Sequence, residues 1–154
     1  MINLTKNIFL KSIGKISSSF TKHSGNKNEI IADIILEKKY VKALRGIEDY
    51  SHIIVLFWLD KITYDEKKQL TIHPRGNDKI PKTGIFSTRS KTRPNPIGLT
   101  VVKLISRKKN ILKVKGLDAF DGSFVLDIKT YDHKDIKINI HVPKWWSNLN
   151  KNKK

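Results

Sequence analysis

Residues 83–100 read TGIFSTRSKTRPNPIGLT, in which two short apolar runs flank a segment rich in arginine and proline. Residues 84–88 and 97–104 have the composition of two strands, and the segment between them carries two arginines and two prolines. Each proline fixes its own φ and biases the preceding residue toward an extended conformation, so Arg93 and Asn95 lie in a stiff, non-helical loop. Such a loop can present a guanidinium and an amide to a ligand. A tight connection between strands with solvated arginines explains the same pattern.

The composition indicates one globular domain with an anionic partner. The chain has 154 residues, which suits a single core, and 38% of them are hydrophobic. The formal net charge is +17 at pH 7, and the isoelectric point is about 10.1. This excess favours nucleic acid as the partner, and a membrane surface second. A coding bias toward Lys, Asn and Ile accounts for part of the excess.

Lysine supplies most of the positive charge, and the chain has only five arginines: Arg45, Arg75, Arg89, Arg93 and Arg107. A lysine contributes a diffuse field, whereas an arginine offers a planar fork that can bind bidentately. Two of the five arginines lie within five residues of each other in the 83–100 stretch. In a chain this poor in arginine, that spacing indicates a specific role.

Several classes of protein are disfavoured by what the sequence lacks. With no cysteine there is no disulfide or thiol chemistry, which fits the cytoplasm. The longest apolar run, residues 53–59, is too short to span a membrane, and no secretory leader is evident at the N-terminus. The five histidines are scattered without metal-ligand spacing, and neither a Rossmann fingerprint nor a P-loop is present.

Alternating apolar positions predict a mainly β fold (α+β at most), a single small β-barrel with short helical turns. Residues 52–60 are apolar enough to indicate a central strand buried on both faces. Residues 41–47 repeat at spacing three and predict helical turns, and residues 63–82 read as a long polar connection. The other predicted strands are residues 7–16, 29–36, 98–106, 110–116, 124–131 and 136–142.

Two groups of charged residues stand where strands end. Asp60 and Lys61 follow the apolar run, and strand ends are where barrels place ligand contacts. Asp118 and Asp121 lie three residues apart before Gly122. Aspartates there cap turns in many proteins, and this structural role is an alternative to ligand binding. At residues 107–110 a hairpin tip forms a cationic knob, which either contacts phosphate or is simply solvated.

Three stretches resemble, in the same order, the TrmO family, which is also called TsaA-like. They are TGIFSTRSKTRPNPIGLTVVKL at 83–104, GIEDYSHIIVLFW at 46–58 and KGLDAFDGSFVLDIKTY at 115–131. The family signature runs GVFATRS…RPNPIGLS. Members often carry a Pro-Arg-Gln-Gly segment near residues 17–28 that helps to close the cofactor site. This chain has SSSFTKHSGNKN instead, with His23, Ser24 and Gly25 in its place, so no role is carried over there.

The resemblance implies a small β-barrel that works as a homodimer and methylates tRNA with S-adenosylmethionine. The acceptor in the family is the exocyclic nitrogen of threonylcarbamoyl-adenosine, next to the anticodon. By motif, the cofactor site maps onto Arg89, Leu99, Asp118, Ala119, Phe120 and Asp121, together with Asp60 and Lys61 at the strand end. No metal is implied, and no residue is marked as the catalytic base.

We assign Arg93, Asn95 and Arg75 to the substrate side, toward the anticodon loop, where unpaired bases are recognised by stacking and edge contacts. A solvated loop arginine explains Arg75 equally well. Residues 1–142 are expected to form the barrel domain, and residues 143–154 a basic tail with Trp145 and Trp146. The tryptophan pair suits either a homodimer interface or packing of the tail on its own domain. A non-catalytic basic β-barrel that binds RNA is the alternative function, and a methyltransferase for another acceptor is a third.

Overall fold

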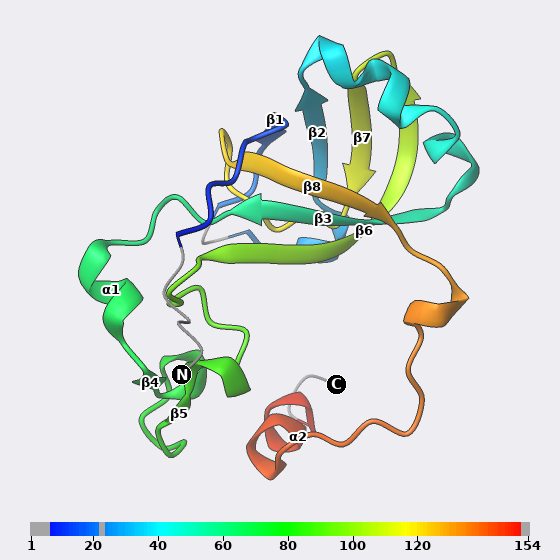
Figure 1. Ribbon diagram of the computed structural model, residues 1–154. Coiled ribbons are helices and arrows are strands. Elements are labelled where there is room, and N and C mark those ends of the chain that lie inside the picture. The colour runs from blue at the N-terminus through cyan, green and yellow to red at the C-terminus, as the bar shows by residue number, and fades with distance from the viewer. Residues whose placement is uncertain (1–6, 22–23, 152–154) are drawn as a thin grey trace, which may run out of the picture. The chain divides into compact units, whose positions relative to one another are not determined.

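The computed structural model describes residues 7–21 and 24–151. Within this part of the chain, six strands form one closed antiparallel barrel in the order β1-β2-β7-β6-β3-β8 (Figure 1). The barrel strands are β1 (Gly14–Ser18), β2 (Ile31–Leu36), β3 (His52–Trp58), β6 (Ile97–Lys108), β7 (Ile111–Lys115) and β8 (Phe124–Thr130). The prediction of a mainly β fold with a small barrel is confirmed.

Alternation of apolar residues builds the barrel interior, because successive side chains of a strand point to opposite faces. The ring closes where β1 meets β8, with Gly14 opposite Val125. The buried cluster inside consists of Ile16, Ala32, Ile34, Leu36, Leu44, Ile53, Val55, Phe57, Val102, Leu112, Val114, Leu117, Ala119 and Val125. Closure leaves the barrel without a free edge, which stabilises the sheet and prevents further strand addition.

Strand β3 is buried on one face and half-buried on the other, so the prediction of burial on both faces is wrong. Ile53, Val55 and Phe57 are buried, whereas the residues between them are only partly covered. The outward side chains lie beside those of β6, as at Leu56 opposite Leu99. Most outward-facing residues of β3 are also apolar, so the sequence shows the continuous apolar run that is typical of a strand buried on both faces.

The start of β6 depends on a glycine without room for a side chain. Gly98 lies opposite Phe57, and a Cβ at Gly98 would come within 2.5 Å of the Phe57 ring. Just before it, the carbonyl of Pro96 accepts a hydrogen bond of 2.8 Å from the Leu59 backbone N–H. The end of β3 and the start of β6 are thereby joined side by side.

The helical turns predicted at residues 41–47 are present as η2 (Lys38–Leu44) and η3 (Ile47–Asp49). Arg107, in the predicted cationic knob, holds them to the barrel. Its guanidinium donates to the carbonyls of Leu44 and Val41 at 3.1 and 3.3 Å, and pairs with Glu48 at 3.0 Å. Arg107 is therefore a structural clamp at this tip and not a solvated cation.

Contacts divide the chain into two compact units, and the second consists of residues 63–95 and 132–154. Its elements are α1 (Tyr64–Lys68), β4 (Thr71–Ile72), η4 (Pro74–Gly76), β5 (Thr83–Gly84), η5 (Ile85–Ser87), η6 (His133–Asp135) and α2 (Lys144–Lys151). Strands β4 and β5 pair with each other, and Pro74, Ile80 and Ile85 are buried. The expected polar connection at 63–82 is thus partly ordered, starting with a capping box between Thr63 and Glu66.

Three predicted strands differ from the structure. The first is Gly14–Ser18 and not 7–16, because β2 ends at Leu36, opposite Gly14, and offers no strand to earlier residues. Of residues 84–88, Gly84 pairs with Thr71, and η5 follows because Thr88 bonds back to the Ile85 carbonyl.

Residues 136–142 form no strand, although Ile136, Ile138, Ile140 and Val142 alternate as a strand would. All four side chains are exposed, and the closed barrel has no edge with which this segment can pair. Alternation alone therefore does not make a strand where no partner is available.

Gly98→Ala should lower the free energy of unfolding by about 1–3 kcal/mol, because a methyl group there overlaps the Phe57 ring. Urea denaturation measures this change. Gly84→Ala is the matched control, since nothing lies within 4 Å of its Cβ position. That variant should leave stability unchanged or raise it by up to about 1 kcal/mol. Adding Phe57→Leu to Gly98→Ala should recover part of the loss, and equal stability of the two alanine variants would contradict the packing argument.

Candidate functional site

The loop between β7 and β8 presents alternate side chains to the barrel interior and to solvent. Leu117 and Ala119 are buried in the core, whereas Asp118 and Phe120 are only partly covered. Gly116, which has a φ of 94°, precedes the loop. The apolar residues thus anchor the loop, and the residues between them are available for other contacts.

Both aspartates of this loop are held by hydrogen bonds. The hydroxyl of Thr100 on β6 donates to Oδ1 of Asp118 at 2.6 Å, and the ammonium of Lys27 lies 3.9 Å from Oδ2. Asp121 accepts a bond of 3.0 Å from the backbone N–H of Ser18 at the end of β1. These partners tie the loop to two strands, so part of each carboxylate has a structural role.

Phe120 of this loop lies next to a second phenylalanine, and a lysine lies near each of the two rings. The rings of Phe20 and Phe120 lie 5.2 Å apart and tilted, with Phe20 almost fully buried. The ammonium of Lys61 lies 4.4 Å from the centre of the Phe120 ring, and that of Lys27 lies 5.3 Å from the Phe20 ring. Together with Asp118, these four residues make a polar and aromatic cluster on the barrel, which we call the loop cluster.

Of the cofactor residues expected in this unit, the structure brings together Lys61 and the 118–121 segment. Asp60 is exposed next to Lys61, directly after β3 and Leu59. Leu99 is 48% exposed and alternates along β6 with Thr100, so its side chain lies on the opposite face of the strand. Leu99 therefore does not share the face of β6 from which Thr100 bonds Asp118.

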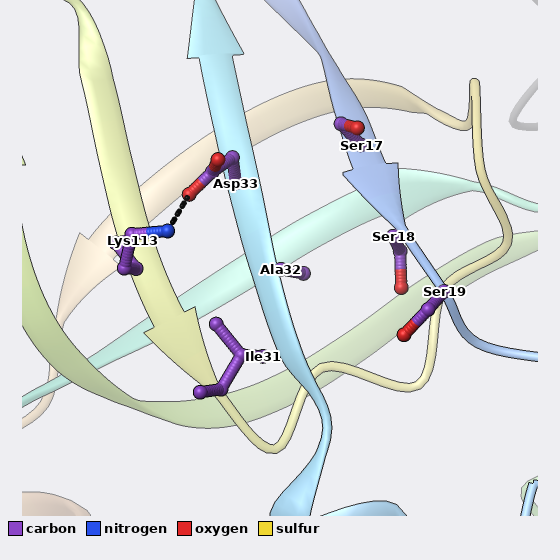
Figure 2. A pocket seen from close by; sticks show the side chains of 7 residues that line it. All are labelled: Ser17, Ser18, Ser19, Ile31, Ala32, Asp33 and Lys113. Carbon is purple, nitrogen blue, oxygen red and sulfur yellow. Dashed lines mark ion pairs between the residues drawn. The ribbon is translucent and has the colours of Figure 1, made fainter.

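Figure 2 shows a separate shallow pocket beside β1, β2 and β7. Asp33 and Lys113 form an ion pair of 3.1 Å across it, and residues 17–19, all serines, line another side. None of the residues predicted to bind a ligand lines this pocket. Ser18 lines this pocket and also contacts the 118–121 loop, because its backbone N–H donates to Asp121.

In the second unit, the guanidinium of Arg93 organises the loop that contains it. Its Nη1 donates to the carbonyls of Thr88 and Ser90, both at 3.0 Å. The same guanidinium lies 5.9 Å from the centre of the Phe86 ring, and Phe86 is 76% exposed. The Arg93 guanidinium is thus held in place by two hydrogen bonds and lies beside an exposed aromatic ring.

An ion pair connects this loop to α1. Lys91 lies 3.2 Å from Glu66, 25 residues earlier in the chain. The backbone N–H of Thr63 is the main cause that holds the pKa of Glu66 below its ordinary value, and the Lys91 ammonium adds to it. The carboxylate therefore caps α1 and at the same time pairs with residues 83–96, which we call the signature loop.

The remaining predicted residues of the second unit lie on its surface. Arg75 is exposed with a φ of 56°, and its guanidinium lies 5.0 Å from the centre of the Trp146 ring. Arg89 and Asn95 are exposed in the loop that Arg93 braces. His23 lies outside the described residues, whereas Ser24 closes a local turn by accepting from the Thr21 backbone N–H at 2.8 Å.

Sequence reasoning missed Phe20, Lys27, Thr100 and Phe86. The first three join the loop cluster only through contacts between segments far apart in the chain, and no local pattern marks them. Among residues 7–21 and 24–151 no group of three or more His, Asp or Glu side chains could hold a metal ion. In the same range, no helix is long and apolar enough to cross a membrane.

Comparison with known proteins supports the resemblance noted in the motifs. Residues 11–135 match the family model described as the tRNA-methyltransferase O N-terminal domain. A protein of Archaeoglobus fulgidus named "S-adenosyl-L-methionine-binding protein" is 41% identical over 129 residues, which is 80% of this chain and 89% of that protein. A mouse "tRNA (adenine(37)-N6)-methyltransferase" is 44% identical over 89 residues, covering 58% of this chain and 20% of the mouse protein.

The crystal structure of TrmO from Pseudomonas aeruginosa has the same fold, with a TM-score of 0.70 and 27% sequence identity. The match covers 88% of this chain and 61% of that one, so the chain spans about three fifths of the solved protein's length. Because the family model covers most of the chain and the fold agrees, the chain belongs to the family of the tRNA-methyltransferase O N-terminal domain.

Proposed function

We propose that the chain binds S-adenosylmethionine and transfers its methyl group to an adenine of tRNA. The acceptor we propose is the exocyclic nitrogen of threonylcarbamoyl-adenosine, next to the anticodon. Family membership over residues 11–135 supports the reaction class. The observation that carries the proposal is the loop cluster, where Asp118 and Phe120 meet Lys61 from the end of β3.

The loop cluster fits the chemical groups of S-adenosylmethionine. Thr100 bonds Oδ1 of Asp118, whereas Oδ2 has only the loose ion pair with Lys27 at 3.9 Å, so Oδ2 can still accept from a hydroxyl or ammonium of the ligand. Lys61 and Lys27 can pair with a carboxylate, and the Phe120 ring offers an apolar face to an adenine or a sulfonium. The bound molecule supplies an activated methyl group. We further assign Arg89, Leu99, Ala119, Asp121 and Asp60 to this site by motif.

Arg93, Asn95 and Arg75 are proposed to hold the tRNA. Methyl transfer is an in-line displacement, so alignment of the acceptor nitrogen accounts for much of the rate. Arg93 suits this positioning role because two backbone carbonyls fix its guanidinium. No side chain is assigned as the base, and lysines supply the salt-sensitive contacts to phosphate.

We also propose a cytoplasmic homodimer with the cofactor site near its interface. In this proposal residues 1–142 act as one TsaA-like domain, and residues 143–154 act as a basic tail. Family resemblance motivates the dimer, and the half-buried Trp145 and Trp146 give it weaker support.

Arg89→Ala should weaken S-adenosylmethionine binding by roughly tenfold or more. The loss of a hydrogen bond to a charged group costs about 1.5–3 kcal/mol, which corresponds to that change in affinity. Titration calorimetry with the cofactor and with its demethylated product measures the effect. Arg45→Ala is the matched control, because Arg45 is exposed and lies outside every proposed site. If the two variants bind alike, the assignment of Arg89 is wrong. If the unaltered protein binds no cofactor, the RNA-binding alternative gains support.

Tail and loop variants should affect methylation differently. Removing Lys151, Lys153 and Lys154 should weaken binding of all tRNAs and lower the salt slope by about one for each lost phosphate contact. Lys153 and Lys154 lie outside the described residues. Arg93→Ala or Asn95→Ala should instead lower the rate at saturating tRNA, because a misplaced reacting group raises the barrier.

Single-turnover methylation of threonylcarbamoyl-bearing tRNA at several salt concentrations separates the two kinds of variant. The rate at saturation should survive removal of the tail lysines. If the loop variants also lose only affinity, the loop is a docking surface and the active site lies elsewhere. Mass analysis of tRNA from a deletion strain identifies the acceptor.

Light scattering should give the mass of a dimer at micromolar protein. The physical reason is that a small barrel with a half-exposed apolar outer face gains stability when that face is covered. A monomer mass under these conditions would contradict the proposed assembly without affecting the proposed reaction.

A further inference from the structure

The second unit carries more positive charge than its share of the chain. Residues 63–95 and 132–154 contain fourteen Lys and Arg residues against five Asp and Glu residues, a net charge of +9. Three of the five arginines of the chain lie there: Arg75, Arg89 and Arg93. A polyanion is therefore the partner that this unit attracts.

One of these arginines lies beside an aromatic ring in the signature loop. Phe86 is 76% exposed, and the centre of its ring is 5.9 Å from the Arg93 guanidinium. The carbonyls of Thr88 and Ser90 fix that guanidinium. A ring this exposed contributes little to the core, and most of its surface is open to a ligand.

A second arginine lies over a tryptophan of α2. The Arg75 guanidinium is 5.0 Å from the Trp146 ring, and Trp145 meets the same ring edge-on at 5.8 Å. Arg75 adopts a left-handed backbone conformation with a φ of 56°, which is unfavourable for a side chain of this kind. Strained residues of this kind persist where the surrounding structure holds them, and they concentrate at functional sites.

Two of the three arginines in the second unit are thus paired with aromatic rings. An aromatic face binds any nucleobase by stacking, and a planar guanidinium stacks on bases and also pairs with phosphate. We propose that the Phe86–Arg93 and Trp146–Arg75 pairs are stacking platforms for unpaired bases of single-stranded RNA. This inference rests on the proposed function, for which the anticodon loop would supply such bases.

Membrane binding is the competing use of exposed aromatic and basic residues. It requires apolar side chains that are free to enter lipid. Here a guanidinium lies 5.0 or 5.9 Å from the centre of each ring, so insertion of the ring into lipid would also take a charge out of water, which is costly. Planar groups held in this way favour flat, charged ligands such as nucleotides.

The test compares Phe86→Leu and Trp146→Leu, which remove the ring but keep an apolar side chain. The probes are a 12-nucleotide oligoadenylate RNA and an abasic oligomer of the same length and charge. Each variant should bind oligoadenylate between about fivefold and a hundredfold more weakly, since a stacked base contributes that much to affinity. Binding of the abasic oligomer should stay within about twofold, because no base is stacked there.

Leu70→Ala is the control variant. Leu70 is 69% exposed in the same unit, and no arginine–aromatic pair includes it. Its variant should bind both probes as the unaltered protein does. The conservative changes Phe86→Tyr and Trp146→Phe should restore most of the affinity for oligoadenylate, because they retain an aromatic face.

The proposal is overturned if the leucine variants bind oligoadenylate normally, if they lose equal affinity for the abasic oligomer, or if Leu70→Ala is equally impaired. It is also overturned if the leucine changes weaken binding only to vesicles of phosphatidylserine and phosphatidylcholine, which would identify a membrane surface. Calorimetry with S-adenosylmethionine separates this inference from the proposed function. If both leucine variants bind S-adenosylmethionine and oligoadenylate normally, the stacking platforms are rejected and the proposed function is not. If the unaltered protein binds neither S-adenosylmethionine nor oligoadenylate, the platforms and the proposed function are both rejected.

Discussion

The Phe57 ring lies so close to the backbone of Gly98 that no side chain fits there, and this contact sets the pairing of β3 with β6. Strands β3 and β6 can pair here because Gly98 has only a hydrogen atom where the buried Phe57 ring approaches it. Strand β6 is twelve residues long in all and pairs with β7 as well as β3. The glycine of the RPNPIG motif is therefore explained by core packing before any ligand is considered.

The same pairing determines where residues 63–95 leave the barrel strands and return to them. Strands β3 and β6 are antiparallel neighbours, and the hydrogen bond from Leu59 to Pro96 joins their ends. Residues 63–95 lie between these ends in sequence, so the segment is a long insertion in a strand connection. Insertions at such positions are tolerated by a rigid scaffold and often carry functional residues. The arginines of the signature are placed on this insertion and not on the barrel.

The two aspartates of the 118–121 loop show that structural and functional roles are not exclusive. Each uses one oxygen to attach the loop, Asp118 to Thr100 and Asp121 to Ser18. A carboxylate oxygen has two lone pairs, so each group can hold its loop and still accept from a ligand. A carboxylate oriented by a second residue is also better prepared for binding than a mobile one.

The barrel class, the helical turns at 41–47 and the rigid arginine- and proline-containing loop could all be predicted from the residues alone. Alternation and proline chemistry are local properties, and they act wherever the residues occur. Three contacts could not be predicted and are known only from the fold: Phe20 with Phe120, Ser18 with Asp121 across 103 residues, and Arg75 with Trp146. It also decided that residues 136–142 remain unpaired, because the barrel closes between β8 and β1. These outcomes depend on which distant segments become neighbours, and no local pattern contains that information.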